Sequence, residues 1–242
     1  QYSWNGSDAQ LWRFVDAGDG KYYIQSKLGT VLDVTSASAA AGTNVQTYTF
    51  NQSTAQKWTL LETEKTLYSI MGKTNVSVSQ MVKFYKNKAT VSYPYSNVSE
   101  APTIEKFCQI YKEESEVEGV KAEVAFAQAM METGFLKFGG DVKKDQYNFA
   151  GIGAIGGGSS GAKFDSIRIG IRAHVQHLKA YASKEALKQP VVDPRFQYVK
   201  RGSAEYVQWL GQKENPNGYG WATAKNYGNN IVKLYILPMK KY

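Results

Sequence analysis

Apolar and polar positions follow two different patterns along the chain. Before about residue 60, short apolar runs such as 21–25 and 30–34 lie between turns that contain glycine, which is typical of β-strands. After about residue 101, apolar positions recur three and four apart in long stretches rich in Ala, Glu, Lys and Met, which predicts helices. We therefore predict a small all-β module over residues 1–61 and a mainly helical domain over residues 66–242, which makes the fold class α+β.

The most apolar helix is predicted over residues 121–134. Within 124–131 only Gln128 is polar, so the helix should be buried on nearly all sides. It should end at Gly134, because glycine readily adopts the left-handed conformation that closes helices. Glu132 then lies in the last turn, where burial and the helix dipole both raise the pKa of a carboxyl group, as a general acid requires. The alternative is an exposed glutamate at a fraying helix end.

Composition limits the class of protein. The 242 residues include 29 Lys+Arg, 21 Asp+Glu and 43% hydrophobic residues, as expected of a folded globular chain. No apolar stretch reaches the roughly 18 residues of a membrane span, and the sequence opens with Gln1 and without a basic-then-apolar segment. We therefore expect no membrane insertion and a mature or excised fragment. The single cysteine, Cys108, lies in an apolar pattern, which favours a buried side chain over a nucleophile.

Positive charge is concentrated in the predicted helical domain. Residues 1–61 hold 4 basic and 4 acidic side chains, so the whole net charge of +8 falls on residues 62–242. Such a charge suits nucleic acid, anionic lipid or an anionic polymer as a partner. No recognition signature for nucleic acid accompanies the charge, so we expect no nucleic-acid partner.

A set of short motifs in the first sixty residues resembles one repeat of the ricin-type β-trefoil lectins. The motifs are the Gln-x-Trp triplets 10–12 and 56–58 and the runs 29–34 and 42–48. The resemblance implies a sugar site made of Asp33, Gln46 and Tyr48, with polar groups for the hydroxyls and a ring under the apolar face of the sugar. Ala55 replaces the asparagine that the family usually carries there. A trefoil has three repeats and residues 1–61 supply little more than one, so a structural remnant is the alternative.

A longer series of motifs, in order from about residue 100 onward, resembles the glucosaminidases of glycoside hydrolase family 73. The motifs are 132–142, 146–154, 170–181, 193–196, 201–202, 220–223, 227–228 and Ile231. The resemblance implies a lysozyme-like, mainly helical fold and hydrolysis of the β-1,4 bond that follows N-acetylglucosamine in bacterial peptidoglycan. It also implies a secreted protein that acts on glycan strands of the cell wall and needs no cofactor. The positive charge would then favour anionic wall polymers as further partners.

The same resemblance assigns residues to the active site. It makes Glu132 the proton donor. The expected substrate contacts are Asn148, Phe149, Gly151, Ile152, Trp221 and Tyr227. Within this set, Asn148 is a candidate donor to an N-acetyl group and Trp221 a candidate platform for sugar stacking. The family's Tyr-Ala-Thr-Asp motif is changed to Trp-Ala-Thr-Ala at 221–224, which leaves ordinary core packing of Trp221 and Tyr227 as an alternative.

The second catalytic group is left open by the sequence. An inverting enzyme would need another carboxylate about 6.5–9.5 Å away, whereas a substrate-assisted one would use the N-acetyl group of the sugar. Asp141, Asp145 and Asp165 are the candidates, each with an ordinary loop or capping role as the alternative.

Two other sequence patterns are weaker candidates for functional sites. His174 and His177 lie three apart on a predicted helix with no Glu or Cys arranged around them, so we expect ordinary helix contacts and no metal. The glycine-rich run 156–163 departs from a phosphate loop and is expected to form a rim beside the cleft.

Two rival functions remain at this point. A lytic transglycosylase can share the fold and a single acid but yields an anhydro-sugar. A catalytically inactive protein that binds cell wall or carbohydrate would fit the changes at Trp221 and Ala224.

Overall fold

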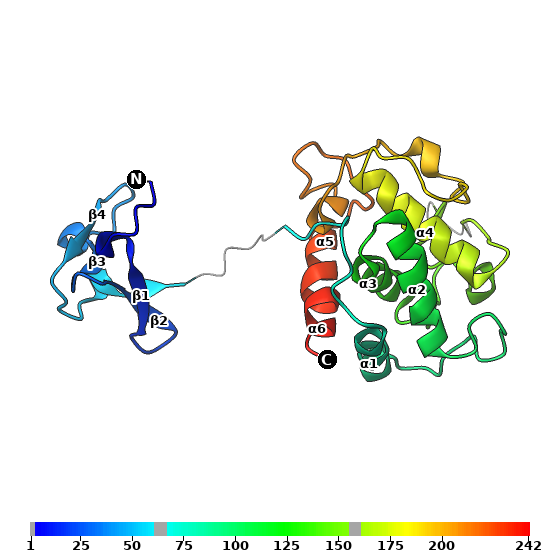
Figure 1. The fold of residues 1–242 in the computed structure, drawn as a ribbon, viewed down its shortest axis with the longest axis horizontal. Coiled ribbons are helices and arrows are strands. Elements are labelled where there is room, and N and C mark those ends of the chain that lie inside the picture. Colours follow the sequence, from blue (N-terminus) through cyan, green and yellow to red (C-terminus); the bar gives the residue numbers. More distant parts are fainter. Residues whose placement is uncertain (1–2, 61–66, 155–160) are drawn as a thin grey trace. The chain divides into compact units, whose positions relative to one another are not determined.

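The structure is a computed structural model in which residues 3–60, 67–154 and 161–242 are described. The chain divides into two compact units, Gln1–Thr66 and Leu67–Tyr242 (Figure 1). We call the first the β unit and the second the helical unit, and each is described by itself. The boundary predicted near residues 62–66 falls outside the described residues, so it stays a prediction.

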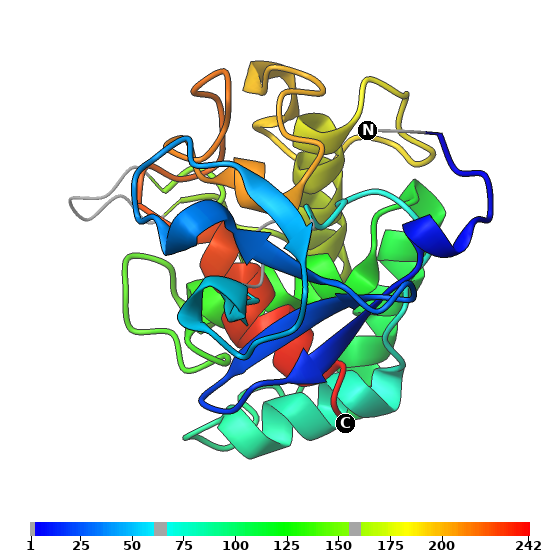
Figure 2. The same ribbon diagram turned by 90° about the vertical axis from the view of Figure 1, so that its left-hand side faces the viewer.

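Five short strands form an antiparallel sheet in the β unit (Figure 2). They are β1 (Trp12–Asp16), β2 (Lys21–Ser26), β3 (Val31–Val34), β4 (Val45–Tyr48) and β5 (Trp58–Thr59), with single turns at Asp8–Gln10, Thr35–Ala37 and Thr54–Gln56. The order is β1-β2-β3-β4, and β5 pairs with β2. β2 and β3 coincide with the apolar runs 21–25 and 30–34, so these two predicted strands are confirmed.

The second Gln-x-Trp triplet, residues 56–58, connects segments of the β unit through side-chain hydrogen bonds. The indole Nε1 of Trp58 donates to the backbone oxygen of Leu32 at 3.1 Å. Gln56 is fully buried, and its Nε2 donates to the backbone oxygen of Thr49 at 2.9 Å and to Oδ2 of Asp33 at 3.1 Å. Because a buried amide needs hydrogen-bond partners, this triplet has a clear structural role in closing the repeat.

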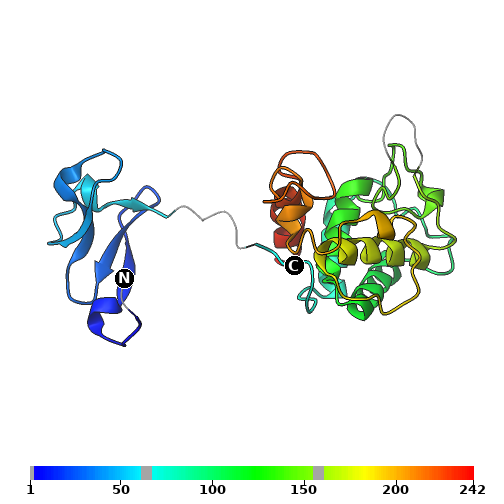
Figure 3. The ribbon, with the colours of Figure 1, turned by 90° about the horizontal axis from the view of Figure 1, so that it is seen from above.

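Helices make up the core of the second unit. They are α1 (Val78–Lys88), α2 (Ile104–Glu118), α3 (Ala122–Thr133), α4 (Ile167–Ala182), α5 (Tyr227–Asn230) and α6 (Leu237–Met239), with a π-helical segment Ile231–Ile236 joining α5 to α6 and short turns at Lys144–Gln146, Phe196–Tyr198 and Val207–Leu210. α2 and α4 pack side by side, and the C-terminal run from α5 to α6 packs against α3 (Figures 1 and 3).

Polar side chains and glycines set the ends of these helices. Ser77, Thr103 and Ser166 accept hydrogen bonds from backbone amides in the first turns of α1, α2 and α4. α2 ends at Gly119 with φ 73° and α3 ends at Gly134 with φ 58°, a left-handed conformation that glycine adopts without a steric penalty. The predicted end of the apolar helix at Gly134 is therefore confirmed.

α3 is the central helix of the helical unit. Every residue from 122 to 130 is buried, and the helix contacts α1, α2, α4 and the segment Ile231–Ile236. Burial on nearly all sides was predicted from its composition and is confirmed. The helix thereby brings Glu132, in its last turn, to the edge of a packed core.

Aromatic side chains fill the core around α3. Phe107 and Phe149 pack edge to face with ring centroids 5.1 Å apart, and Tyr111 packs on Phe126 at 5.7 Å. Cys108 lies fully buried in the same core, where burial raises the pKa of its thiol. The prediction of a buried cysteine is confirmed. Among the helices of the described residues, none is both long and apolar enough to span a membrane.

Candidate active site

Glu132 lies in a cleft at the C-terminal end of α3. The cleft has a volume of about 270 Å³ and is lined by Glu132, Thr133, Gly134, Phe138, Gly140, Asp141, Val142, Asn148, Gly151 and Ala154. Gly151, on the opposite wall, has φ 65°, and a Cβ added to it would stand 4.0 Å from Oε2 of Glu132. The wall therefore approaches the carboxyl group closely at a position that favours glycine.

The environment of Glu132 favours its protonated form. Burial raises the pKa of this carboxyl group, and a hydrogen bond from Tyr227 to Oε1 partly offsets the rise. The residue is nevertheless exposed to solvent, because its free surface faces the cleft while protein surrounds the carboxyl group from behind. The predicted direction of the pKa shift is thus confirmed, and the alternative of a fraying helix end does not fit a carboxyl group held by a buried phenol.

A buried chain of hydrogen bonds leads to Glu132. Tyr227 donates to Oε1 of Glu132 and accepts at 2.8 Å from Nε2 of Gln128, one turn earlier on α3. Oε1 of Gln128 lies 2.9 Å from Nε2 of His174 on α4, and Nδ1 of His174 lies 3.2 Å from the hydroxyl of Tyr111 on α2. Side chains from four helices are therefore linked through α3 to one carboxylate.

All the hydrogen bonds in this series are donated in the same direction, from Tyr111 toward Glu132. Burial lowers the pKa of His174 to about 3, so the ring is neutral and carries one N–H. Since Oε1 of Gln128 can only accept, that N–H is on Nε2, and Nδ1 accepts from Tyr111. Burial raises the pKa of Tyr227 well above its usual value, so its phenol keeps the proton that it donates to Glu132. Each bond polarises the next toward the carboxylate.

Asn148 and Phe149 support the wall opposite Glu132 from within. Asn148 is fully buried, and its Nδ2 donates to the backbone oxygens of Ile152 at 2.9 Å and Ala162 at 3.0 Å. Its Oδ1 accepts from the backbone amide of Ile152 at 3.0 Å. Phe149 is fully buried in the aromatic core. Both side chains thus shape the wall from within, although Asn148 also lines the cleft, and contact of either residue with substrate stays a prediction.

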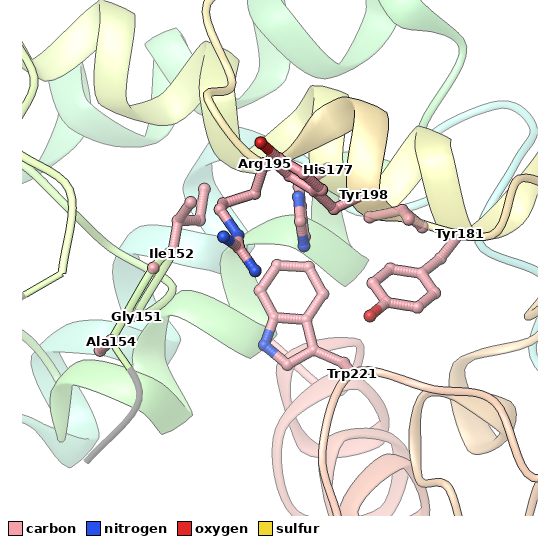
Figure 4. A pocket seen from close by; sticks show the side chains of 10 residues that line it. Gly151, Ile152, Ala154, His177, Tyr181, Arg195, Tyr198 and Trp221 are labelled. Carbon is pink, nitrogen blue, oxygen red and sulfur yellow. The ribbon is translucent and has the colours of Figure 1, made fainter.

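Trp221 and Ile152 line a second pocket rather than the Glu132 cleft itself (Figure 4). The Trp221 ring is half-buried and packs edge to face on His177 with centroids 4.6 Å apart, and Tyr181 lies beside it at 5.8 Å. Gly151 belongs to both pockets, so the two spaces adjoin. Trp221 stays a predicted sugar platform. The hydroxyl of Tyr227 is bonded to Glu132, and a contact of Tyr227 with substrate stays a prediction.

The three candidate second carboxylates lie in different surroundings. Asp141 lines the cleft together with Glu132. Asp145 lies 4.0 Å from the ammonium group of the exposed Lys163, and Asp165 directly precedes Ser166, which caps α4. Only Asp141 of the three shares the cleft, so it is the candidate that the geometry favours.

Both histidines of α4 have ordinary protein partners. His174 belongs to the series of hydrogen bonds that ends at Glu132. Nδ1 of His177 lies 2.7 Å from Oδ2 of the buried Asp193. Within the described residues, no group of three or more His, Cys, Asp or Glu side chains is arranged to hold a metal ion. Most of the predicted glycine-rich rim, at 155–160, lies outside the described residues.

The predicted sugar site of the β unit is more closed than expected. The carboxylate of Asp33 accepts from Nε2 of Gln46 and from Nε2 of Gln56, both at 3.1 Å, and the residue is buried. Tyr48 on β4 is 51% exposed. The structure therefore brings Asp33 and Gln46 together but bonds them to each other, and sugar binding by these residues stays a prediction.

The family model described as mannosyl-glycoprotein endo-beta-N-acetylglucosaminidase matches residues 108–236. The match exceeds half of the chain and includes α3, the cleft and Tyr227. The chain belongs to the glucosaminidase family. Its glucosaminidase domain is that of a glycoside hydrolase. The expected mainly helical domain, which follows a small all-β module along the sequence, is confirmed.

A second family model, the ricin-type beta-trefoil lectin domain-like model, matches residues 8–91. The chain therefore carries a lectin-like domain in front of the glucosaminidase domain. The match runs beyond Thr66 and through α1, although Met81 and Phe84 of α1 are buried in the core of the helical unit. We assign the lectin-like domain to the β unit alone, because packing defines where a domain ends.

Individual proteins resemble the chain over part of its length. A Borreliella burgdorferi protein, named as uncharacterized, is 46% identical over 132 residues, which are 54% of this chain and 61% of that protein. The match thus spans less than two thirds of that relative. The crystal structure of S. aureus autolysin E in complex with the muropeptide NAM-L-Ala-D-iGlu is similar with a TM-score of 0.47 and 20% identity, covering 72% of each chain. A likeness at that level supports no statement about the glucosaminidase site.

Sequence reasoning missed Gln128 and His174 as partners of the glucosaminidase site. A signal existed for Gln128, since it is the single polar residue in the apolar run 124–131 and a buried amide must be bonded. The partner on α4 lies 46 residues away, and only the packing of α3 against α4 brings the two side chains together.

Proposed function

We propose that the protein is a peptidoglycan hydrolase that cleaves the β-1,4 bond following N-acetylglucosamine, with Glu132 as general acid. The observation that carries this proposal is the placement of Glu132: a carboxyl group with a raised pKa, in a cleft, held by a buried phenol at the end of α3. A carboxyl group that stays protonated can protonate the glycosidic oxygen as the bond breaks toward an oxocarbenium-like state.

Two adjoining pockets support the proposal that a glycan strand binds at this site. The cleft at Glu132 and the pocket at Trp221 adjoin at Gly151, where the absence of a side chain lets a sugar lie close to the backbone. An aromatic ring beside polar groups suits a pyranose, which has an apolar face and a rim of hydroxyls. Gly151, Ile152 and Trp221 are the proposed substrate contacts, and Tyr227 acts by holding the acid.

The second catalytic group has two candidates. Asp141 lines the same cleft and would activate water in an inverting reaction, whereas the N-acetyl group of the sugar would replace it in a substrate-assisted one. Asp141→Asn separates the two routes. A loss of about 10²-fold or more in kcat/KM supports Asp141 as the base, and nearly unchanged activity together with resistance of N-deacetylated glycan supports the substrate-assisted route.

Two substrates fit a glucosaminidase domain. The family description mentions mannosyl-glycoproteins, whereas the motifs resemble enzymes that act on peptidoglycan. The net charge of +8, all of it on residues 62–242, favours a cell wall with anionic polymers over a neutral mannose-rich glycan. We therefore place the proposed action outside the cell, at the wall.

The test compares the intact chain with Glu132→Gln on purified peptidoglycan and on a mannosylated glycoprotein. The glutamine keeps the shape of the side chain but has no proton to deliver. We expect the rate to fall about 10²–10⁴-fold and reduced N-acetylglucosamine ends to appear, after borohydride treatment and mass spectrometry, only with the unchanged chain. Glu185→Gln, on an exposed segment after α4, is the matched control and should keep full activity.

Other products would point to other functions. Anhydro-sugar ends would identify a lytic transglycosylase, and cleavage of the glycoprotein alone would move the substrate away from the wall. Binding of peptidoglycan by both proteins without any release of fragments would replace the hydrolase with a wall-binding protein.

A further inference from the structure

The pocket beside the Glu132 cleft contains a cation that the proposed reaction does not use. This pocket, here called the Arg195 pocket, has a volume of about 200 Å³ and lies between the backbone of 151–154 and the side chains of His177, Tyr181, Arg195 and Trp221. It shares Gly151 and Ala154 with the Glu132 cleft. Figure 4 shows the Arg195 side chain extending into it toward Trp221. A group bound there would lie next to the sugar held at Glu132.

Arg195 differs from the other arginines of the helical unit. Arg168 and Arg172 form ion pairs with Glu113 and Glu114, and Arg201 donates to two backbone oxygens. The guanidinium group of Arg195 makes no hydrogen bond or ion pair with any residue in the described part of the chain, and it rests on the ring of Tyr198, 4.6 Å from the centroid. Its five N–H donors are therefore available to a ligand.

The acidic residue nearest in sequence does not neutralise this cation. Asp193 has no exposed side-chain surface, and its Oδ2 lies 2.7 Å from Nδ1 of His177. Its Oδ1 accepts from the backbone amide of Arg195 at 2.8 Å. Both carboxylate oxygens are thus engaged in orienting the His177 ring and the turn before Tyr198. The guanidinium group remains the free charge of the pocket.

We propose that the Arg195 pocket binds a carboxylate of the peptide that is attached to the glycan. This inference rests on the proposed function. Alternate sugars of peptidoglycan carry a lactyl-linked peptide with free carboxylates, so a cleft that holds the glycan at Glu132 must receive that peptide at its side. A guanidinium group binds a carboxylate through two parallel hydrogen bonds, and the ring of Tyr181 in the same pocket offers an apolar surface to the small side chains of such a peptide, while the ring of Trp221 is left to the sugar.

The experiment compares two glycans of equal length, one with its peptides and one from which an amidase has removed them. Both are first stripped of teichoic acids, so that peptide carboxylates are the anions that differ between them. For Arg195→Gln we expect kcat/KM to fall about tenfold on the peptide-bearing glycan, mainly through KM, and less than about twofold on the bare glycan. Arg195→Lys should be intermediate, because it keeps the charge and loses the fork. Lys188→Gln, an exposed charge outside the pocket, is the control.

Binding is measured separately in the Glu132→Gln background, where nothing is cleaved. Calorimetry with soluble forms of both glycans should show tighter binding of the peptide-bearing form, and Arg195→Gln should remove that preference. Equal losses on both glycans, or no loss on either, would overturn the inference and leave the hydrolase proposal intact. If the unchanged chain cleaves neither glycan, the hydrolase proposal fails, and the binding comparison still decides whether the pocket recognises the peptide.

Discussion

The two units of the chain bury their apolar side chains to very different degrees. In the helical unit, residues 122–130 of α3 are buried throughout and aromatic rings pack around them. In the described part of the β unit, Tyr23 and Val31 are the buried hydrophobic side chains, while Trp12 and Phe14 on β1 are 40% and 59% exposed. The helical unit has a complete core, and the β unit has little more than a sheet held by hydrogen bonds.

The difference follows from the number of repeats each fold needs. A domain of about 60 residues buries only about 60% of the surface of its unfolded chain, so it is marginally stable even when its core is complete. A β-trefoil places the apolar faces of three repeats in one shared core, whereas residues 1–61 hold little more than one such repeat. Small size and a single repeat thus account for the sparse core of the β unit.

The largest expected effect on folding comes from producing the two units as separate fragments. The fragment 67–242 should unfold in urea in one cooperative transition, because its core lies within the fragment. The fragment 1–66 should show no cooperative transition, because its apolar side chains lack partners. Circular dichroism against urea concentration measures both.

The opposite result would change the view of the β unit. A sharp transition for 1–66 would mean that one lectin-like repeat is a stable domain, and loss of folding in 67–242 would mean that the helical unit depends on the β unit. Activity of 67–242 on soluble glycan is the matched readout and should stay close to that of the intact chain.

A single aromatic substitution in each unit sharpens the comparison at a smaller scale. Phe126→Ala in α3 removes a fully buried ring and should cost about 3–5 kcal/mol of the free energy of unfolding. Phe14→Ala on β1 removes an exposed ring and should change stability by about 0.5 kcal/mol or less. Urea midpoints for the first variant and amide hydrogen exchange in β2 for the second are the measurements. Comparable costs for both rings would mean that β1 is covered in solution.

The sequence predicted elements whose determinants are local. The burial of α3, its end at Gly134, the raised pKa of Glu132 and the burial of Cys108 all follow from neighbours along the chain, and each is confirmed. β2 and β3 were predicted for the same reason, because their apolar runs lie between glycine turns.

Features that depend on packing between distant segments were not predictable in the same way. Tyr227 reaches Glu132 across 95 residues, and this contact was not predicted from the sequence. Asn148 was predicted as a donor to an N-acetyl group, and in the structure its amide is buried and bonded to the backbone of Ile152, because the turn from 148 to 152 folds back on its own side chain. The second catalytic group stays open for a similar reason, since the spacing of Asp141 along the chain carries no information on its distance from Glu132.

The smallest expected effect is a shift in the pH profile of activity, and it follows from comparing one carboxylate in each unit. In the β unit, Asp33 accepts hydrogen bonds from Gln46 and Gln56, whereas Glu132 accepts one from Tyr227 and faces an open cleft. A hydrogen bond to a carboxylate stabilises its charged form, and burial opposes this by favouring the protonated form. The pH dependence of activity therefore measures how far the protein has kept this carboxyl group protonated.

Tyr227→Phe removes the hydrogen bond and leaves the burial of Glu132, so the pKa of that carboxyl group should rise further. Because a general acid must be protonated, activity is lost as pH rises through this pKa, and the alkaline limb of the kcat/KM profile should move to higher pH by up to about one unit. Gln128→Leu weakens the donor behind Tyr227 and should move the limb in the same direction by less. Tyr235→Phe is the control. It removes a phenol that lies near Glu132 but, within the described part of the chain, forms no hydrogen bond with it. A shift of the alkaline limb to lower pH in Tyr227→Phe would mean that the phenol stabilises the protonated carboxyl group. Every hydrogen bond in the series from Tyr111 to Glu132 would then have to be donated in the opposite direction.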